Sequence, residues 1–238
     1  MGSAQANKGL IASYTRWRSS SLGRTTDRLE WQLLFELAAP LAGQQLLDVG
    51  CGDGALAAEF ARHSAIVTAL DADPVMIAAA RRRREITSVP MQLVEGQAEN
   101  LPFGDGTFDR VVATTVLCFV RGAEHAFAEM ARVLKPGGRL VIGELGRFSL
   151  WAARRRIRGW LGDPIWQAAA FRTVSELRDF AEAAGLEEVQ IRGAVHYPPC
   201  AVAAKILAPV DSWIGRHTTF ASAFLALSAK KPVAAAGS

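Results

Sequence analysis

Short apolar runs alternate along the chain with longer segments in which apolar residues recur at helical spacing. Seven of the short runs are predicted to be strands: Gln45–Val49, Ile66–Leu70, Met91–Val94, Arg110–Ala113, Arg139–Gly143, Glu187–Arg192 and Ala223–Ser228. Most of them are apolar at successive positions, which is typical of strands that are covered on both faces. The pattern therefore predicts an α/β fold in which helices cover a mostly parallel sheet.

Helical patterns fall between these runs, and we expect helices at Asp27–Ala39, Ala55–His63, Pro74–Glu85, Ala123–Leu134 and Val174–Ala184. Pro74 suits a first helical turn, and Thr173 precedes Glu176 at the spacing of a capping box. The sequence Lys135-Pro136-Gly137-Gly138 is expected to close a helix before the fifth strand.

The whole chain, residues 1–238, is predicted to form one domain, with residues 1–40 as an N-terminal helical cap. Two segments, 147–172 and 196–220, do not fit the simple alternation of strands and helices. Both follow the part of the chain that carries the ligand-binding motifs described below. We therefore expect them to be insertions that shape a substrate pocket.

The composition indicates an ordinary globular protein, because half of the residues are apolar and 21% are charged. A formal net charge of +4 is only a weak pointer to polyanionic partners, although arginines cluster at 81–84 and 154–158. The three cysteines lack metal-ligand spacing, so no metal site is expected. The sequence shows neither a secretory signal pattern nor an apolar run long enough to span a membrane, so a cytoplasmic location is predicted.

A glycine-rich turn follows the first predicted strand. In Leu46–Ala55, which reads LLDVGCGDGA, the residues Gly50, Gly52 and Gly54 allow positive φ angles and a close backbone approach to a ligand. The same letters also fit the dinucleotide pattern G-x-G-x-x-G/A, and Asp71 stands 21 residues after Gly50, where a ribose-binding acid is expected. The glycines alone therefore leave the ligand open.

Two carboxylates beside the turn distinguish the ligands. A dinucleotide would place a pyrophosphate here, which Asp48 and Asp53 would repel. A ligand with a cationic amino acid part would instead be attracted by a carboxylate at the end of the strand. The alternative role of Asp48 is structural, as an acceptor for backbone N–H groups of the turn.

The segment LLDVGCGDG resembles the first motif of the class I S-adenosylmethionine-dependent methyltransferases, in the group that includes the ubiquinone and menaquinone C-methylating enzymes. Four further segments are similar to the family's motifs in order and spacing: Val67–Pro74, Glu95–Phe103, Phe108–Val120 and Val133–Val141. The resemblance covers roughly residues 45–145. It implies a Rossmann-like, seven-stranded, mostly parallel sheet with helices on both faces and an antiparallel last strand.

The resemblance also implies S-adenosyl-L-methionine as the cofactor, S-adenosyl-L-homocysteine as its product, and a set of cofactor-binding residues. Asp71, with Ala72 beside it, would bind the ribose hydroxyls, and Gln97, Ala98 and Glu99 would hold the adenine. The remaining residues of the expected cofactor site are Asp48, Gly50, Gly52, Gly54 and Ala113.

The sequence departs from the family pattern at three places. Gln97 replaces the aspartate that usually receives the adenine amino group, and its amide oxygen can still accept that hydrogen bond. In the loop after the fourth strand, Cys118 and Phe119 replace a polar pair with a histidine and predict an apolar wall. The segment Tyr14–Trp17 is similar to an entrance helix that closes over the cofactor, with Thr15 in place of aspartate; packing on the domain surface is the alternative.

The expected reaction is a metal-independent, in-line methyl transfer to an O, N, C or S nucleophile of a small-molecule acceptor, for which alignment matters most. A general base is needed only if the acceptor must lose a proton. Glu144, His196 and Tyr197 lie at the expected carboxyl edge of the sheet and are candidates, each with a structural alternative. The sequence assigns no catalytic residue.

In Ser149–Leu161 the residues Leu150, Trp151, Ile157, Trp160 and Leu161 are expected near one helical face, with four arginines around the rest. A lid over an apolar acceptor, a helix on an anionic membrane surface, and an ordinary covering helix all fit.

An inactive cofactor-binding protein of the same fold and an NAD(P)-dependent oxidoreductase are the alternative functions. No nucleic-acid partner is expected, because no separate nucleic-acid-binding domain is visible. The oligomeric state does not follow from the sequence.

Overall fold

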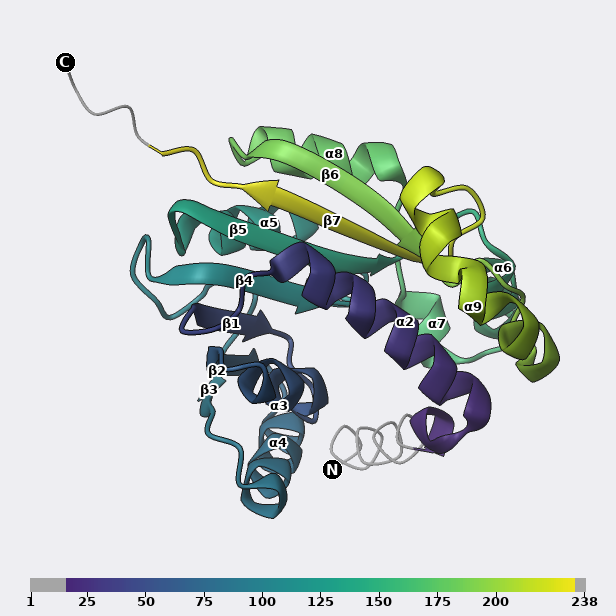
Figure 1. Cartoon of the computed structure of the whole chain (residues 1–238), viewed down its shortest axis with the longest axis horizontal. Helices are drawn as coiled ribbons and strands as arrows, with labels where there is room; N and C mark the ends of the chain where they lie inside the picture. Colours follow the sequence, from purple (N-terminus) through teal and green to yellow (C-terminus); the bar gives the residue numbers. More distant parts are fainter. Residues whose placement is uncertain (1–15, 234–238) are drawn as a thin grey trace.

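The computed structural model describes residues 16–233, which form a seven-stranded sheet covered by helices on both faces (Figure 1). The strands are β1 (Gln45–Val49), β2 (Ile66–Asp71), β3 (Gln92–Glu95), β4 (Phe108–Thr114), β5 (Leu134–Leu145), β6 (Glu187–Ala194) and β7 (Phe224–Lys230). Their order across the sheet is β3-β2-β1-β4-β5-β7-β6. The strand order reverses between β1 and β4, and open α/β sheets bind ligands at the carboxyl ends of the strands beside such a reversal.

The strands β1 to β5 pair in parallel, and β7 pairs antiparallel with both β5 and β6. The predicted fold class, with its antiparallel last strand, is therefore confirmed. The antiparallel strand does not lie at the edge of the sheet, because β7 enters between β5 and β6. The edge strands are β3 and β6.

In the described part of the chain, helices α2 to α9 surround the sheet: α2 (Ser21–Ala38), α3 (Ala55–Arg62), α4 (Pro74–Thr87), α5 (Ala123–Arg132), α6 (Leu150–Trp160), α7 (Pro164–Ala168), α8 (Val174–Ala183) and α9 (Ala201–His217). One core cluster joins the sheet to α2, α3 and α9, and a second joins it to α5 and α8. Successive side chains of a strand point to opposite faces of the sheet. Strands that are apolar at every position therefore contribute to both clusters.

Several predicted helix boundaries are wrong. The helix expected to begin at Asp27 begins at Ser21. The helix expected at Ala123–Leu134 ends at Arg132, and Leu134 already belongs to β5. Residues 135–138, expected to lie outside the strand, are part of β5, because Leu134 pairs with Phe108 before a bulge shifts the register to Arg139 opposite Arg110. A Cβ on Gly138 would lie 2.8 Å from the carbonyl oxygen of Lys135, so glycine permits this bulged path.

The two expected insertions are helical. Residues 147–172 contain α6 and α7 after β5, and residues 196–220 contain α9 after β6. Because β5 is parallel to β1 and β6 is antiparallel to β7, both insertions leave the carboxyl edge of the sheet, where Figure 1 shows α6 and α9. Of the N-terminal segment Tyr14–Trp17, Tyr14 and Thr15 lie outside the described residues, while Trp17 packs against the core of the α2 side.

Candidate functional site

The glycine turn lies between β1 and α3, at the carboxyl edge of the sheet. Gly50, Gly52 and Gly54 have φ angles of +68°, +55° and +73°. The N–H of Cys51 donates to the carbonyl oxygen of Leu70 at 2.9 Å, which fastens the turn to β2. The turn is thus held as a backbone loop that side chains other than glycine would strain.

The three glycines differ in what surrounds them. A Cβ on Gly50 would lie 2.3 Å from Val116 Cγ2, and one on Gly54 would lie 3.0 Å from the Cβ of Ala80. These two glycines therefore permit close packing within the protein. At Gly52, no atom of the described residues outside its chain neighbours lies within 4 Å of such a Cβ. Gly52 faces open space, as a residue that contacts a ligand through its backbone would.

Asp71, at the end of β2, fixes the turn from the side. Its carboxylate accepts hydrogen bonds from the N–H of Gly52 at 2.8 Å and from the N–H of Asp73 at 2.9 Å. Burial raises the pKa of Asp71, and these backbone hydrogen bonds oppose the rise. The structural role that the sequence left open for Asp48 therefore belongs to Asp71, which binds the N–H group at the middle of the turn.

Asp48 is a buried carboxyl at the end of β1. Its Oδ2 atom has no hydrogen-bond partner within residues 16–233. Burial, together with the nearby charge of Asp71, raises the pKa of Asp48 to about 8. An unpartnered buried carboxyl oxygen is rare in folded proteins, and a cationic or hydrogen-bonding ligand is one explanation for it.

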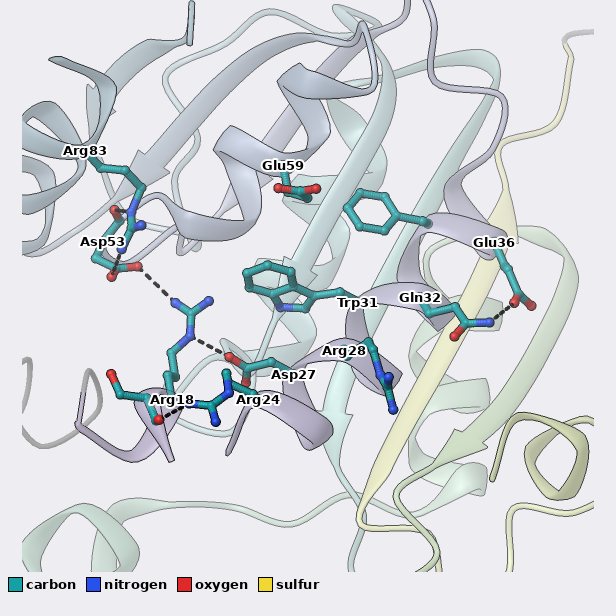
Figure 2. Close-up of a pocket in the computed structure, with 12 residues that line it drawn as sticks. Arg18, Arg24, Asp27, Arg28, Trp31, Gln32, Glu36, Asp53, Glu59 and Arg83 are labelled. Atoms are coloured by element: carbon teal, nitrogen blue, oxygen red, sulfur yellow. Dashed lines mark hydrogen bonds and ion pairs between the residues drawn. The ribbon is translucent and has the colours of Figure 1, made fainter. Parts of the chain in front are cut away.

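Asp53 does not act as the sequence argument assumed. Figure 2 shows its carboxylate between two arginines: Arg83 from α4 and Arg18, whose Nη1 atom lies 3.5 Å from Asp53 Oδ1. Arg18 also pairs with Asp27 of α2 at 2.6 Å. Since the Asp53 charge is compensated and the pKa of Asp48 is raised, the predicted electrostatic repulsion of a pyrophosphate does not follow from this structure.

A cavity of about 930 Å³ lies beside this charge network, between α2 and the glycine turn (Figure 2). Trp31 and Phe35 of α2 form its apolar wall, and Arg18, Asp53 and Arg83 form its polar wall. The N-terminal helical cap thus contacts the glycine turn through the Arg18–Asp53 ion pair and borders a space large enough for a small organic ligand.

The remaining expected cofactor residues lie on the neighbouring strand ends. Asp71 is in register with Glu95 of β3, and the N–H of Gly96 donates to the Asp71 carbonyl oxygen at 3.1 Å. This places the turn of Gln97, Ala98 and Glu99 immediately after the register partner of Asp71; Ala98 is buried and Gln97 exposed. Ala113, buried in β4, is in register with Val49. The topology therefore brings all the predicted residues to one edge of the sheet.

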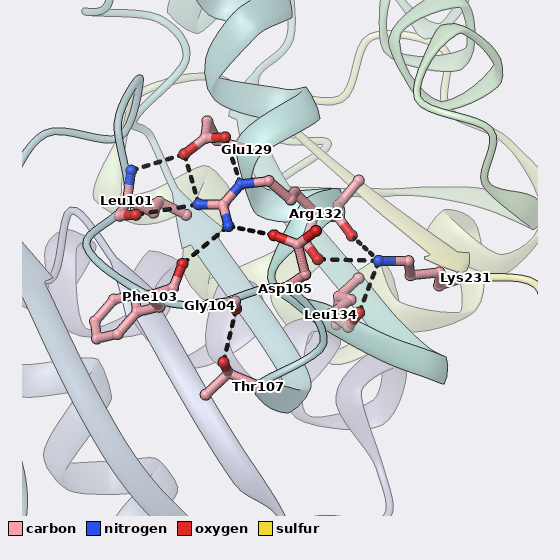
Figure 3. Close-up of polar contacts among 10 residues, drawn as sticks. Leu101, Phe103, Gly104, Asp105, Thr107, Glu129, Arg132, Leu134 and Lys231 are labelled. Carbon is pink, nitrogen blue, oxygen red and sulfur yellow. Dashed lines mark hydrogen bonds and ion pairs between the residues drawn. The ribbon is translucent and has the colours of Figure 1, made fainter.

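The loop after this turn is held by a polar network that the sequence did not reveal (Figure 3). Arg132, at the end of α5, donates to the carbonyl oxygens of Leu101 and Phe103 and pairs with Asp105 and Glu129. These partners lie about thirty residues before Arg132 in the chain, or within its own helix, so no local pattern indicates the contact. Lys231 continues the network by donating to the carbonyl oxygens of residues 131, 132 and 134.

A second buried carboxyl, Glu144, lies at the end of β5 on the opposite face of the sheet from Asp48. Its Oε1 atom accepts a hydrogen bond from the N–H of Leu117 at 2.8 Å, and Oε2 has no partner in the described part of the chain. Burial raises the pKa of Glu144 to about 7, although the hydrogen bond from Leu117 opposes the rise. Glu144 thus positions the loop after β4, and with a pKa of about 7 it can bind or release a proton near neutral pH.

The other two candidate bases are engaged in packing. His196 lies between Asp211, at 3.2 Å from Nδ1, and the carbonyl oxygen of Thr218, at 3.3 Å from Nε2. The hydroxyl of Tyr197 lies 3.0 Å from Thr26 Oγ1 in the core, and burial raises the pKa of Tyr197 to about 12. These contacts support a structural role for His196 and Tyr197.

The insertion 147–172 is joined to the loop after β4. The N–H of Ala170 donates to the Cys118 carbonyl oxygen, and Arg172 donates to that of Leu117, each at 2.8 Å. Cys118 is buried in a small cluster with Phe171, while Phe119 is about half exposed. Burial raises the pKa of the Cys118 thiol well above its usual range, which keeps it protonated.

The apolar residues of α6 do not share one environment, contrary to expectation. Trp151 is buried, and its Nε1 atom donates to the Tyr197 carbonyl oxygen at 2.8 Å. Four other residues are exposed: Leu150, Ile157, Trp160 and Leu161. The helical spacing of apolar residues in the sequence does not distinguish the buried Trp151 from the exposed Trp160.

Between residues 16 and 233, no three histidine, cysteine or acidic side chains are grouped so that they could hold a metal ion. In the same range, no helix has the length and apolar character needed to cross a bilayer.

The fold and this edge define a class: an α/β protein that binds its ligand at the carboxyl ends of parallel strands, around a glycine turn and an acidic strand end. Residues 47–142 match a family model described as a methyltransferase domain. This segment therefore has the sequence of a methyltransferase domain, in agreement with the resemblance to the class I S-adenosylmethionine-dependent type.

Known proteins support this assignment. The chain is 31% identical over 188 residues to an uncharacterised protein of Mycobacterium tuberculosis, covering 79% of this chain and 62% of the relative. It is 40% identical over 104 residues to a demethylmenaquinone methyltransferase of Tropheryma whipplei, covering 43% of this chain and 42% of the relative. A crystal structure of a SAM-dependent methyltransferase from Thermotoga maritima shares the fold, with a TM-score of 0.71 and 23% identity over 93% of this chain and 96% of that one. The matched segments span less than two thirds of the two sequence relatives.

Proposed function

We propose that the chain transfers a methyl group from S-adenosylmethionine to a small-molecule acceptor. The observation that carries the proposal is the carboxyl edge itself, where Gly52 faces open space and Asp48 presents a buried oxygen without a partner in residues 16–233. When bound, S-adenosylmethionine would supply a methyl group attached to a sulfonium sulfur, and this sulfur would be the leaving group.

The residues at the edge suit the parts of this cofactor. Asp71 has free lone pairs beyond those used by the Gly52 and Asp73 N–H groups, so it can accept from ribose hydroxyls. Gln97, Ala98 and Glu99, on the adjacent strand end, would hold the adenine, and Asp48 would face the cationic amino acid part. Ala72 and Ala113 would contact the cofactor through their backbone or methyl groups.

The protein's contribution to the reaction is then mainly alignment, because an in-line displacement depends on how the nucleophile and the methyl carbon are oriented. The insertions 147–172 and 196–220 would form the acceptor side, with α2 closing the cofactor side. Among the candidate bases, Glu144 is the one with an unpartnered oxygen in the described residues, so it could hold a proton released by an acceptor. We also propose that the protein is located in the cytoplasm.

Calorimetric titration tests the cofactor half of the proposal. We expect S-adenosylhomocysteine to bind with a dissociation constant in the micromolar range, about −7 to −8 kcal/mol. NADH serves as the matched control, since it shares the adenosine part but lacks the cationic amino acid part that Asp48 would face; we expect it not to compete at similar concentrations. Tighter binding of NADH would contradict the proposal and favour an oxidoreductase.

A transfer assay tests the second half. Quinol, phenol, amine and thiol acceptors are incubated with labelled S-adenosylmethionine, and methylated product is detected by mass. We expect product from at least one class. Cofactor binding without product across all classes would instead support a cofactor-binding protein that has lost transfer activity.

The raised pKa of Asp48 predicts a pH dependence. The free carboxyl, with a pKa of about 8, is mostly protonated at pH 7, and a cationic ligand favours the ionised form. Binding should therefore release a proton and strengthen as the pH rises from about 6 to 7.5, by up to about tenfold per unit if this group alone is linked. Titrations in buffers of different ionisation enthalpy measure the proton release directly.

In Asp48→Asn, which cannot ionise, we expect a weaker and nearly pH-independent affinity over this range; an unchanged pH slope would contradict the assignment.

A further inference from the structure

Helix α9 exposes a stripe of large apolar side chains. Its fully buried positions carry small or polar residues: Ala204, Ala208, Asp211 and Gly215. Leu207 packs partly buried against the core, whereas Val202, Ile206, Val210 and Trp213 are exposed. A helix that covers a core normally buries its large apolar side chains, so this exposed stripe requires a separate explanation.

Close packing explains the inner face but leaves the outer face without a role in the fold. A Cβ on Gly215 would lie 2.0 Å from the Gly193 carbonyl oxygen, so α9 approaches β6 at backbone distance. Asp211 accepts hydrogen bonds from the N–H groups of Val195 and His196, which fixes the rotation of the helix. The stripe is therefore held outward, with Trp213 65% exposed.

Helix α6 adds a second exposed face next to the segment that leads into α9. Arg154 donates to the Pro199 carbonyl oxygen at 3.2 Å, just before α9 begins. On α6 and the residue after it, Ile157, Trp160 and Leu161 are exposed, Trp160 by 83%. We call the outward residues of the two helices together the α6–α9 face; the hydrogen bond from Arg154 to Pro199 joins its two parts.

Basic residues accompany the apolar ones on this face. Lys205 and Arg154 are exposed, and α6 contains no acidic residue, while the single acid of α9, Asp211, is buried. Two other arginines of the run are held by aromatic rings: Arg155 stacks on Trp151 and Trp166, and Arg156 on Phe171. Of the arginine cluster at 154–158, Arg154 and Arg158 are thus the outward members, and Arg158 pairs with Asp163 at 2.6 Å.

A groove of about 420 Å³ between α2 and α9 borders the stripe. Arg28 and Lys205 line it, together with the polar residues Ser21 and Thr25 of α2. Cations and hydroxyl groups beside an exposed apolar stripe are the groups that bind a phosphate headgroup next to acyl chains.

We propose that the α6–α9 face docks the protein on an anionic phospholipid bilayer, with the apolar stripe of α9 in the interface and Lys205 near lipid phosphates. The charge of the face argues against a second copy of the chain, since a two-fold contact would bring like charges of the same face together. Docking of this kind is peripheral and requires no spanning helix. It does not depend on the proposed methyl transfer, because it is measured without cofactor.

Cosedimentation with vesicles tests the proposal. We expect the full chain to bind vesicles of phosphatidylcholine with 30% phosphatidylglycerol at least tenfold more tightly than pure phosphatidylcholine. The double variant Lys205→Gln/Arg154→Gln should weaken binding to the anionic vesicles about 25-fold, because each cation near the surface contributes about fivefold. Ile206→Ser/Trp213→Ser should weaken it at least tenfold.

Helix α4 supplies matched controls on another part of the surface. Arg81→Gln/Arg82→Gln removes the same charge from exposed positions, and Ile86→Ser removes an exposed apolar residue. We expect these variants to bind as the unmodified chain does, with unchanged circular dichroism in all of them. Equal losses in test and control variants, or no preference for anionic vesicles, would overturn the proposal. So would a concentration-dependent dimer that Ile206→Ser/Trp213→Ser dissociates while the unmodified chain binds no vesicle.

Discussion

Replacing Gly52 by alanine is expected to weaken the binding of S-adenosylhomocysteine by about 30- to 100-fold, or 2–3 kcal/mol, while the domain stays folded. The reason is the open space beside this residue. Within the described chain no neighbouring atom lies within 4 Å of the added Cβ, so the methyl group collides with nothing in the protein. It would occupy the space that we assign to the cofactor. Calorimetric titration measures the affinity.

The φ angle of Gly52, +55°, also makes alanine strained, by about 1 kcal/mol. Gly185, in the turn between α8 and β6, provides the control: its φ is +68°, and a Cβ there likewise meets no described atom within 4 Å. Gly185→Ala should lower the free energy of unfolding by the same amount as Gly52→Ala and leave the affinity unchanged. Equal affinities of the two variants would show that the space beside Gly52 is not the cofactor site.

Trp151→Ala is expected to lower the free energy of unfolding by about 3–5 kcal/mol. The indole is buried between α6 and the core of the α2 side, and its N–H donates to the Tyr197 carbonyl oxygen. Truncation leaves a cavity and an unsatisfied acceptor. Urea denaturation followed by circular dichroism measures the change.

Trp160→Ala serves as the matched control, because this indole belongs to the same helix and is exposed. Its effect on stability should stay within about 0.5 kcal/mol. Trp151→Phe separates packing from hydrogen bonding, and should lose less than Trp151→Ala. If Trp160→Ala destabilised the domain as much as Trp151→Ala, the exposed placement of Trp160 would be wrong.

Much of the sheet could be predicted from the sequence, because parallel strands covered on both faces leave a strong local signal. The strand Gln45–Val49 has the predicted bounds, and the glycine turn that follows has the positive φ angles that its glycines suggested. Asp71 also lies at the end of its strand, beside the turn. These features depend on residues that are neighbours in the chain.

What the sequence missed depends on distant partners. The arginines that pair with Asp53 come from α4 and from the segment before α2, so the charge argument built on Asp53 could not include them. The start of β5 at Leu134 depends on its pairing with Phe108, which overrides the loop-forming Lys135–Gly138 sequence. In α6, the contact between Trp151 and Tyr197 decides which side faces inward.

The position of β7 has a consequence for how the domain is made during translation. β6 lies at the edge of the sheet and pairs with β7, which is synthesised some thirty residues later. Until residues 224–230 leave the ribosome, β5 and β6 both expose unpaired backbone groups on the sides that β7 will fill. The first five strands can pair as they emerge, whereas β6, with α9 packed on it, waits for the last strand. A ribosome stalled before Phe224 would therefore carry a chain in which the sides of β5 and β6 that β7 covers are open to other strands.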